Sequence, residues 1–297
     1  MNETGLPPSL RSGSPALFKR MITLSLKRWR LEAKLRQGDA AKRVGRTIAH
    51  ISNIETGEQL PPAADLELLL GLYGQQDRIP FMRELLDAAR KATNWWKPLS
   101  GNVPDWFDLF LGLEDGATEL SSYDNANVRG LLQTRDYAEA VIRGNPDLTD
   151  EQVGQLVDVR MGRQQVLTRD ASPVHLTSVM DESVLYRRRG DAKVMYDQLA
   201  HLVKLSMRPR IDLQILPFDA GPSPAADCGA FTVLTFPPEM EGDPGLVYVE
   251  LLTGGTYIEK KEEIAAYRRA LTRLHALAAD PKSSRAIIKR AMKEVST

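Results

Sequence analysis

Residues 34–57, KLRQGDAAKRVGRTIAHISNIETG, carry the pattern that decides the fold of the N-terminal part of the chain. Ala41 is small enough to let two helices cross closely, and Gly45 suits the turn that joins them. The corner beneath the crossing is filled by three apolar residues, Val44, Ile51 and Ile54. The segment therefore predicts two short helices joined by a tight turn, the first over 37–44 and the second capped by Thr47.

Helical patterns continue on both sides of this segment. Upstream, apolar residues recur as on one face of a helix, at Phe18, Ile22, Leu26 and Trp29. The helix that Thr47 caps runs to about Thr56, Gly57 ends it, and two prolines at 61 and 62 then break the chain. Two more apolar faces follow, at Leu66, Leu69, Leu70 and Tyr73 and at Phe81, Leu85, Leu86 and Ala89. We therefore expect five short helices within residues 17–93.

The second helix of the turn has an outer face without long charged side chains. With Ile51 and Ile54 turned inward, this face carries Ile48, Ala49, Ser52 and Asn53. Residues 17–57 hold ten basic and three acidic side chains, a net charge of about +7, although the whole chain is formally neutral. A helix that enters a DNA major groove needs compact side chains near base edges and basic or amide groups near phosphates. The pattern favours a polyanion partner; a solvated helix face is the alternative explanation of the charge.

The length of 297 residues allows two domains. The polar residues 1–16 predict a disordered tail, and residues 17–93 form the helical domain. Residues 94–104, rich in Trp, Pro, Gly and Asn, predict a linker to a second domain over 105–297. We expect a group of aromatic residues around the linker to dock the two domains, an aromatic ligand-binding box being the alternative. The group consists of Trp95, Trp96, Trp106, Phe107 and Phe110.

The second domain combines helices with a small sheet. Helical patterns cover 106 to about 120, 134–143, 150–168, 192–207, 260–279 and 281–294. Short β-rich runs bounded by Pro and Gly cover 174–180, 211–216, 231–236 and 246–252. We expect an α+β fold, mainly α, in which a helical region precedes a small, mostly antiparallel sheet with covering helices.

The turn region matches a known pattern at seven positions, Gln37, Ala41, Gly45, Ile51, Ile54, Glu55 and Gly57. On these residues it resembles the XRE (lambda-repressor-like) helix-turn-helix family. The resemblance implies a five-helix, lambda-repressor-like domain that binds double-stranded DNA. Three positions depart from the family pattern, with Arg36 in place of a Thr or Ser cap, Gly38 early in a helix and Ala40 in place of Leu.

The resemblance also implies roles for individual residues. Its base-reading positions are Ile48, Ala49 and Asn53, to which the shared outer face adds Ser52. Asn53 suits a bidentate pair with adenine. The contacts to DNA phosphates are Gln37, Thr47 and His50, to which the flanking charges add Arg43 and Arg46. Arg30 and Glu55 match a buried ion pair that clamps the first helix to the third and is structural.

Further motifs lie downstream, at Gly130-Leu-Leu-Gln-Thr, Tyr137-Ala138, Arg160-Met-Gly-Arg-Gln-Gln, Asp181-Glu182, Gln198-Leu199 and Val247-Tyr-Val-Glu. With them, the chain from about Trp95 onward resembles the companion domain of WhiJ-like XRE regulators of actinobacteria. Such proteins are transcriptional regulators, are often encoded beside a small acidic protein, and are sometimes called antitoxin-like. Arg129 stands where that family usually has Pro, which predicts a reshaped loop. The resemblance supplies no ligand-binding residues.

The residues of two of these motifs allow two interpretations. Arg160, Arg163 and Gln164 share one helix face, and Asp181 and Glu182 directly follow a strand. A buried bridge from an arginine of the helix to an acid of the sheet explains both. The alternative is a polar pocket or a groove for a partner peptide.

The sequence does not favour catalysis. It holds no phosphate loop of the GxxxxGK[ST] type and no nucleophile elbow, and Gly254 and Gly255 fit a hairpin turn. Glu182 and Glu250 are a weak candidate for a carboxylate pair. Cys228 is the single cysteine, so an intrachain disulfide and a cysteine-based metal cluster are excluded. We expect no cofactor and no metal. The histidines have no metal-ligand spacing; they are His50, His175, His201 and His275.

Together these observations predict a sequence-specific DNA-binding transcriptional regulator, not an enzyme, whose C-terminal domain senses a partner protein or a small effector. We expect a homodimer on DNA, because one such module reads few bases. No signal segment and no membrane span is evident, so we expect a cytoplasmic protein that binds no membrane. The alternative is an antitoxin-like interaction protein that mainly sequesters a small acidic protein encoded by a neighbouring gene.

Overall fold

The computed structural model describes residues 5–7, 10, 13–99, 101, 103–170 and 172–295. The chain forms two compact units. The N-terminal unit comprises Met1–Asn94 and Pro237–Asp243, and the C-terminal unit comprises Trp95–Phe236 and Pro244–Thr297. The first division falls at the start of the segment expected to be a linker, whereas no local pattern indicated that residues 237–243 belong with the N-terminal helices.

The described part of the N-terminal unit contains five α-helices, Pro15–Glu32 (α1), Gln37–Val44 (α2), Ile48–Glu55 (α3), Ala63–Leu72 (α4) and Ile79–Lys91 (α5). The start of α1 falls inside the expected disordered tail. The hydroxyl of Ser14 accepts a hydrogen bond from the N–H of Leu17, and Pro15 fits the first helical turn. The expectation of disorder is therefore wrong for Pro15 and Ala16, while residues 1–4, 8, 9, 11 and 12 of that tail lie outside the described residues.

The core of the N-terminal unit lies where α1 packs against α5 and where α2 meets α3 and α4. Its centre is made of side chains that are at most 1 % exposed, among them Ile22, Leu26, Ile51, Ile54, Leu66, Leu69 and Leu85. Ala40 is fully buried between these helices. The apolar spacing that predicted the helices thus marks the faces that they bury.

The segment expected to be a linker is packed within the C-terminal unit. Trp96 is 1 % exposed and forms an apolar cluster with Leu111 and Val159. Trp95 lies against Gly162, where a Cβ has no room. The aromatic residues that we expected to dock two domains therefore bury much of their surface inside one unit.

A six-stranded mixed sheet forms the centre of the C-terminal unit, with the strand order β3-β2-β1-β4-β5-β6. The strands are Glu119–Asp124 (β1), His175–Asp181 (β2), Ile211–Leu216 (β3), Phe231–Thr235 (β4), Leu246–Leu251 (β5) and Gly254–Ile258 (β6). β1 pairs in parallel with β2, and β2 with β3, whereas the other three pairings are antiparallel. The chain is α+β and mainly α, as expected.

Two strands of this sheet were not expected from the sequence. β1 occupies residues that follow a helical pattern, but the helix before it ends at Gly116. Gly254 and Gly255, expected to form a hairpin turn, instead begin β6, and the turn lies at Leu252 and Thr253. Gly255 is required inside the strand, because a Cβ there would collide with the ring of Tyr248 on β5.

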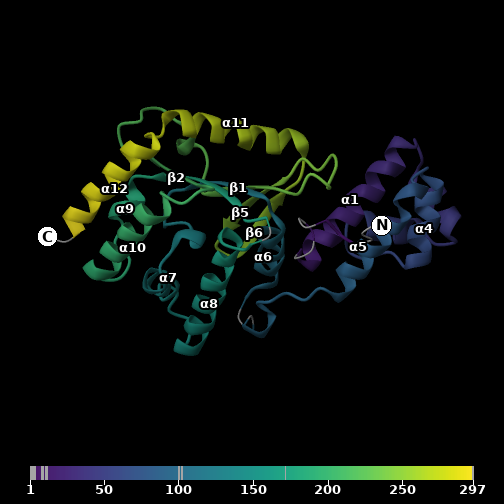
Figure 1. Ribbon diagram of the computed structural model, residues 1–297, viewed down its shortest axis with the longest axis horizontal. Coiled ribbons are helices and arrows are strands. Elements are labelled where there is room, and N and C mark those ends of the chain that lie inside the picture. Colours follow the sequence, from purple (N-terminus) through teal and green to yellow (C-terminus); the bar gives the residue numbers. More distant parts are fainter. Residues whose placement is uncertain are drawn as a thin grey trace. The chain divides into compact units, whose positions relative to one another are not determined.

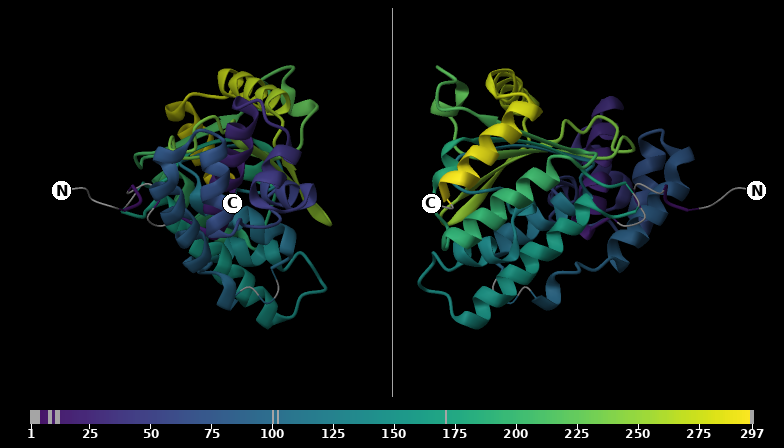
Figure 2. Two further views of the ribbon diagram at one scale, coloured as in Figure 1. Left: turned by 90° about the vertical axis from the view of Figure 1, so that its right-hand side faces the viewer. Right: turned by 60° about the vertical axis from the view of Figure 1, so that its left-hand side comes forward.

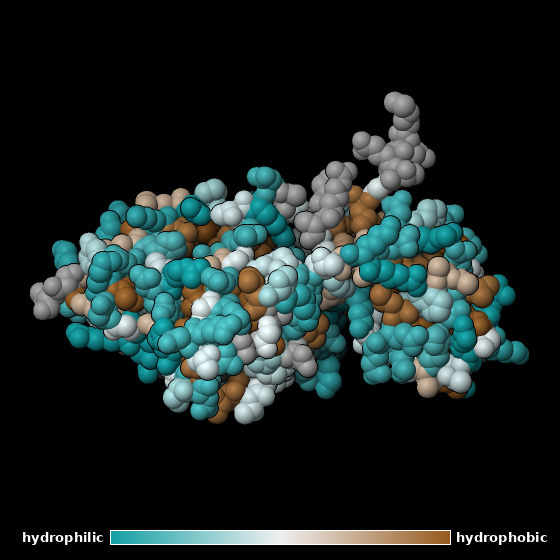
Figure 3. Space-filling model, turned by 90° about the horizontal axis from the view of Figure 1, so that it is seen from below, coloured by the Kyte–Doolittle hydropathy of each residue, from teal (hydrophilic) through white to brown (hydrophobic). Residues whose placement is uncertain are grey.

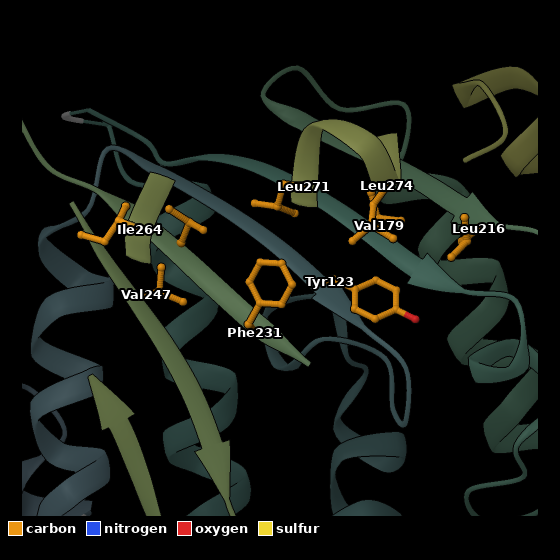
Figure 4. Packing of buried hydrophobic residues seen from close by; sticks show 9 residues of the cluster. Tyr123, Val179, Leu216, Phe231, Val247, Ile264, Leu271 and Leu274 are labelled. Atoms are coloured by element: carbon orange, nitrogen blue, oxygen red, sulfur yellow. The ribbon is translucent and has the colours of Figure 1, made fainter. Parts of the chain in front are cut away.

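Helices cover both faces of the sheet (Figures 1 and 2). They are Asp105–Gly116 (α6), Arg135–Ile142 (α7), Asp150–Arg163 (α8), Ser183–Tyr186 (α9), Ala192–Leu205 (α10), Lys261–Leu277 (α11) and Pro281–Val295 (α12). α11 lies along one face, and α6, α7, α8 and α10 lie on the other side. Leu271 and Leu274 of α11 pack onto Tyr123, Val179 and Phe231 of three neighbouring strands (Figure 4).

The surface is mainly hydrophilic on the face drawn in Figure 3, where hydrophobic residues gather only in small separate groups. Among the described residues, exposed apolar side chains include Ile48 on α3, Phe218 after β3 and Leu252 at the hairpin turn. Within the described residues, no helix combines the length and the apolar character that a bilayer crossing requires.

Candidate nucleic-acid interface

The turn between α2 and α3 has the geometry of a helix-turn-helix. Gly45 ends α2 in the left-handed region, with φ of 65°, and the N–H of Arg46 donates to the carbonyl of Ala41 at 2.9 Å. Thr47 then caps α3, since its hydroxyl accepts a hydrogen bond from the N–H of His50 at 3.2 Å. Ile51 is 1 % exposed beneath the turn. These contacts fix the direction in which α3 leaves the turn.

The outer face of α3 carries the four residues expected to read bases. Ile48 is 58 % exposed, Ala49 is exposed, and Ser52 and Asn53 are half-buried. The side-chain amide of Asn53 makes no hydrogen bond to the described residues, so its donor and its acceptor are both available to a base edge. The structure therefore brings the four predicted base-reading residues onto one accessible face.

A buried ion pair holds α3 to α1. Arg30 Nε and Nη2 donate to the two carboxylate oxygens of Glu55 at 2.5 and 2.8 Å, and both side chains are less than 10 % exposed. This hydrogen bonding raises the pKa of Arg30. Gln37 Nε2 donates to the same carboxylate at 2.9 Å, and Arg30 Nη1 donates to the carbonyl of Leu35. The side-chain nitrogen of Gln37, expected to contact a phosphate, thus ties α2 to the pair.

His50 is placed differently from the other residues expected near DNA phosphates. Its Nε2 lies 3.1 Å from Asp65 Oδ2 on α4, and its side chain is only 15 % exposed. Arg46 Nε lies 3.4 Å from the same oxygen, but the Arg46 side chain is 53 % exposed. The ring of His50 therefore links α3 to α4. Of the residues expected to contact phosphates, Arg43, Arg46 and Thr47 are exposed.

Part of the positive charge counted in the sequence is neutralised inside the N-terminal unit. Arg20 donates from Nε and Nη2 to both carboxylate oxygens of Asp243, at 2.8 and 2.9 Å. Arg28 pairs with Glu241, which also pairs with Arg78, a residue outside the counted segment. Exposed basic side chains around the turn remain at Lys34, Arg36, Lys42, Arg43 and Arg46. The charge available to a polyanion is therefore concentrated around α2 and α3.

Two features of this unit escaped the sequence analysis. Asp39 Oδ2 accepts a hydrogen bond from the N–H of Arg36 at 2.8 Å, so α2 is capped from within although Arg36 replaces the usual hydroxyl residue. Asp243 and Glu241 reach α1 from more than 200 positions away in the chain. No local pattern around Glu241 and Asp243 indicates that they pair with arginines of α1. Asp39, by contrast, stands three positions after the N-cap residue Arg36, which is a recognisable capping signal.

The motifs of the C-terminal unit mostly hold one loop in place. Gly130–Leu132 forms a short 3-10 turn, and the side chain of Gln133 closes it by donating to the carbonyl of Val128 at 2.6 Å. Gln164 Nε2 and Gln198 Nε2 donate to the carbonyls of Gln133 and Leu132 at 2.7 and 2.8 Å. The amides that stand out in the sequence therefore satisfy the backbone of this turn.

The expected bridge from an arginine of the helix to an acid of the sheet has a different partner. Arg163 donates from Nε and Nη2 to both carboxylate oxygens of Glu114 on α6, at 2.7 and 2.9 Å, and both side chains are buried. Glu182 instead pairs with Arg290 of α12 at 2.7 Å. The prediction of a buried arginine pair was right in kind and wrong in partner, because sequence spacing did not reveal that α6 lies against α8.

The structure separates the residues weighed for catalysis. Glu182 and Glu250 line two different pockets. His175 lies 2.6 Å from Asp212, and His275 Nδ1 lies 2.8 Å from Gln214 Oε1. Among the described residues, no group of three or more His, Cys, Asp or Glu side chains is placed to hold a metal ion.

Two family models match the chain. Residues 24–78 match a helix-turn-helix domain, which includes α2 and α3. Residues 107–290, more than half of the chain, match a domain of unknown function (DUF5753). No curated protein and no solved structure matches the chain. The chain therefore belongs to the DUF5753 family and carries a helix-turn-helix domain of the DNA-binding kind at its N-terminal end.

Proposed function

We propose that this protein is a sequence-specific transcriptional regulator that reads duplex DNA with α3. The main observation behind the proposal is that the outer face of α3 is accessible and that the helix is firmly held. Its side chains are compact and accessible, the amide of Asn53 is unoccupied, and the buried pair of Arg30 and Glu55 holds the helix in a fixed direction. A rigid helix with a free amide is what bidentate recognition of adenine requires.

Phosphate contacts supply most of the affinity in this proposal. The exposed cations at Arg36, Lys42, Arg43 and Arg46 lie on α2 or at its two ends, next to the reading helix. Binding then weakens steeply as salt rises, because each neutralised phosphate releases counterions. The protein acts as a homodimer, since a single module of this kind reads too few base pairs to select one site.

The C-terminal unit serves to sense an effector or a partner protein and to change the DNA affinity. The support for this is the path of the chain, which leaves β4, contributes residues 237–243 to the N-terminal unit and returns to β5. Asp243, at the end of that segment, is buried in its pair with Arg20 of α1. A change in the strands that flank the segment therefore acts on α1 through the chain itself.

The replacement of Asn53 by alanine tests the reading role. A duplex enriched from a random library by the wild-type protein serves as the specific site, and a shuffled duplex serves as the reference, both followed by fluorescence anisotropy. Asn53→Ala is expected to lower affinity for the specific site by about 5- to 150-fold, the value of one bidentate base contact, and to leave the shuffled duplex nearly unchanged.

Gln75→Ala is the matched control, since it removes an amide that follows α4 in the same unit. It should leave both affinities as they are. Equal losses on the two duplexes for Asn53→Ala would remove the base-reading role. A wild-type protein that binds neither duplex would refute the proposed function and favour an interaction protein instead.

A further inference from the structure

A cavity of about 270 Å³ lies in the C-terminal unit on the side of the sheet opposite α11. Its walls come from α6, α8, the loop before Gly130 and the ends of β1, β4 and β5. A cavity of about 150 Å³ already accepts a molecule of the size of benzene. This one therefore has room for a ligand of several more heavy atoms.

The sheet beneath the cavity is polar where a buried face is ordinarily apolar. Ser122 on β1 is in register with Ser178 on β2 and with Thr232 on β4, and Thr232 is in register with Tyr248 on β5. All four residues are at most 3 % exposed. Ser122 Oγ donates to Asp124 Oδ2 at 2.8 Å and lies 3.4 Å from Ser178 Oγ, and Thr232 Oγ1 accepts from Arg129, so these hydroxyls are used within the protein. Of the row, Thr232 and Tyr248 line the cavity and give its floor a polar character.

Arg129 stands over this row with unmet hydrogen-bonding capacity. It is 7 % exposed, and its Nη1 donates to Thr232 Oγ1 at 2.8 Å. Its Nη2 and Nη1 lie 3.8 Å from oxygens of Glu114 and Asp124, too far for hydrogen bonds. Nε and Nη2 are buried and have no hydrogen-bond partner among the described residues. A buried cation with two unsatisfied donors lowers the stability of the fold. A ligand that accepts hydrogen bonds from both donors removes this penalty, which adds to its binding free energy.

Nε and Nη2 of Arg129 form the edge of the guanidinium with which other arginines of this chain bind carboxylates. Arg20, Arg30 and Arg163 each donate from Nε and Nη2 to both oxygens of one carboxylate. The geometry is a matched fork with two parallel hydrogen bonds. Arg129 presents the same edge without a carboxylate at hydrogen-bonding distance, since Glu114 lies 3.8 Å from its Nη2.

Among the described residues, the charged side chains that line the cavity are three arginines and two acids, Arg129, Arg160, Arg163, Asp124 and Glu250. Glu114 neutralises Arg163 through two hydrogen bonds. Burial lowers the pKa of Arg160 to about 10, which leaves it protonated at neutral pH, and its Nη1 donates to Gln133 at 3.1 Å. Burial raises the pKa of Asp124, whose carboxylate lies 3.8 Å from Arg129 Nη1, and Glu250 is exposed. Arg129 and Arg160 are thus the cations of the lining that no described carboxylate holds through a hydrogen bond, and they are the ones left to bind an anion.

Aromatic rings form the remaining wall. Phe110 stacks on Tyr248 with 4.2 Å between ring centroids, and Phe107 stacks on Phe110 at 5.5 Å. The hydroxyl of Tyr248 is buried and has no hydrogen-bond partner among the described residues. Gly255 leaves the space that the Tyr248 ring occupies. A flat apolar group fits against such rings, and the idle hydroxyl offers a further contact to a polar substituent.

We propose that this cavity binds a small organic acid, whose carboxylate takes the Nε and Nη2 edge of Arg129 and whose planar body lies against Phe110 and Tyr248. A rotation of the Arg129 guanidinium toward the cavity accompanies binding, because both nitrogens are shielded from solvent in its absence. The proposal rests on the proposed function in one respect: it identifies the bound acid as the effector of the proposed regulator.

Ligand-observed NMR on the full chain tests the site with acetate, benzoate and phenylacetate as probes, each beside its own neutral amide. Benzoate or phenylacetate is expected to bind more tightly than acetate, and each acid at least about 10-fold more tightly than its amide, since one charge-assisted fork is lost. Inorganic phosphate is expected to bind more weakly than the aromatic acids, because it has no planar body.

Arg129→Lys keeps the buried charge and removes the fork, so it should weaken binding of the aromatic acids by about 10-fold or more. Arg135→Lys, an exposed arginine on α7 outside the cavity, is the control and should change nothing. Amides that bind as well as acids, an undiminished affinity of Arg129→Lys, or no binding by any of the three acids would each overturn the proposal.

DNA binding by the wild-type protein without any probe is measured separately. If DNA binding is intact and no acid binds, the site is refuted and the proposed reading of DNA stands. If an acid binds with the expected dependence on Arg129 and no DNA is recognised, the site stands and the proposed function is refuted.

Discussion

The buried pair of Arg30 and Glu55 allows a quantitative test of how α3 is held. Arg30→Met removes two hydrogen bonds to a carboxylate that is 3 % exposed, and leaves that carboxylate with Gln37 as its remaining side-chain donor. Loss of one partner of a buried pair costs about 3–5 kcal/mol in the free energy of unfolding. Glu55→Met should cost a similar amount, because it leaves the guanidinium of Arg30 with one bond to the carbonyl of Leu35.

The double replacement by methionine should cost much less than the two single losses together. Both buried charges are gone, and what remains is one unsatisfied amide on Gln37 and one carbonyl at Leu35, about 1–3 kcal/mol in all. The assay is amide hydrogen exchange of α1 and α3 across a urea series, read by mass spectrometry. Arg83→Met, which breaks an exposed pair with Glu67 in the same unit, should cost below about 1 kcal/mol.

Additive effects of the two replacements would refute this reasoning, since a coupled pair must give a large interaction energy in the double-mutant cycle. The reasoning would also be refuted if Arg30→Met lowered the free energy of unfolding by no more than the exposed control Arg83→Met does.

Three further predictions concern stability. Gly154→Ala should raise the free energy of unfolding by about 1 kcal/mol, because nothing lies within 4 Å of a Cβ there; Gly162→Ala in the same helix should lower it, because the new Cβ meets an indole ring, and urea unfolding of the two variants should move in opposite directions. Burial raises the pKa of Asp115 to about 6, so the folded protein keeps a proton that the unfolded chain has lost, and stability falls as pH rises from about 4 to 6. Asp115→Asn should flatten that fall in thermal unfolding curves, and an unchanged slope would contradict it. Asp243→Asn weakens the buried pair with Arg20 and should speed hydrogen exchange in α1, whereas equal protection would show that the pair does not hold this helix.

Local patterns in the sequence were sufficient to predict the N-terminal helices. The apolar faces of α1 to α5, the cap at Thr47 and the left-handed Gly45 are local signals, and each is present in the structure. The exposed face of α3 follows from the same spacing. Such features depend on residues within one or two helical turns, so a sequence contains what is needed to place them.

The missed parts depend on neighbours that are distant in the chain. β1 has the sequence ELSSYD, which lacks the usual β-branched residues. Ser122 shares the strand face of Asp124, which lines the cavity, and its hydroxyl donates to that carboxylate. β6 contains two glycines because a tyrosine of β5 needs the space. The pairs of Arg163 with Glu114 and of Arg20 with Asp243 join residues 49 and 223 positions apart. No periodic pattern records such partners.

The central claim is that α3 reads the sequence of duplex DNA. The most direct measurement is enrichment of a random-sequence duplex library by the full chain at low and at moderate salt, followed by sequencing. We predict that the wild-type protein enriches one motif with two related half-sites, that Gln75→Ala enriches the same motif, and that Asn53→Ala loses the preference at an adenine in each half-site. A library that stays random with the wild-type protein at both salt concentrations, or an Asn53→Ala motif identical to the wild-type motif, would contradict the account.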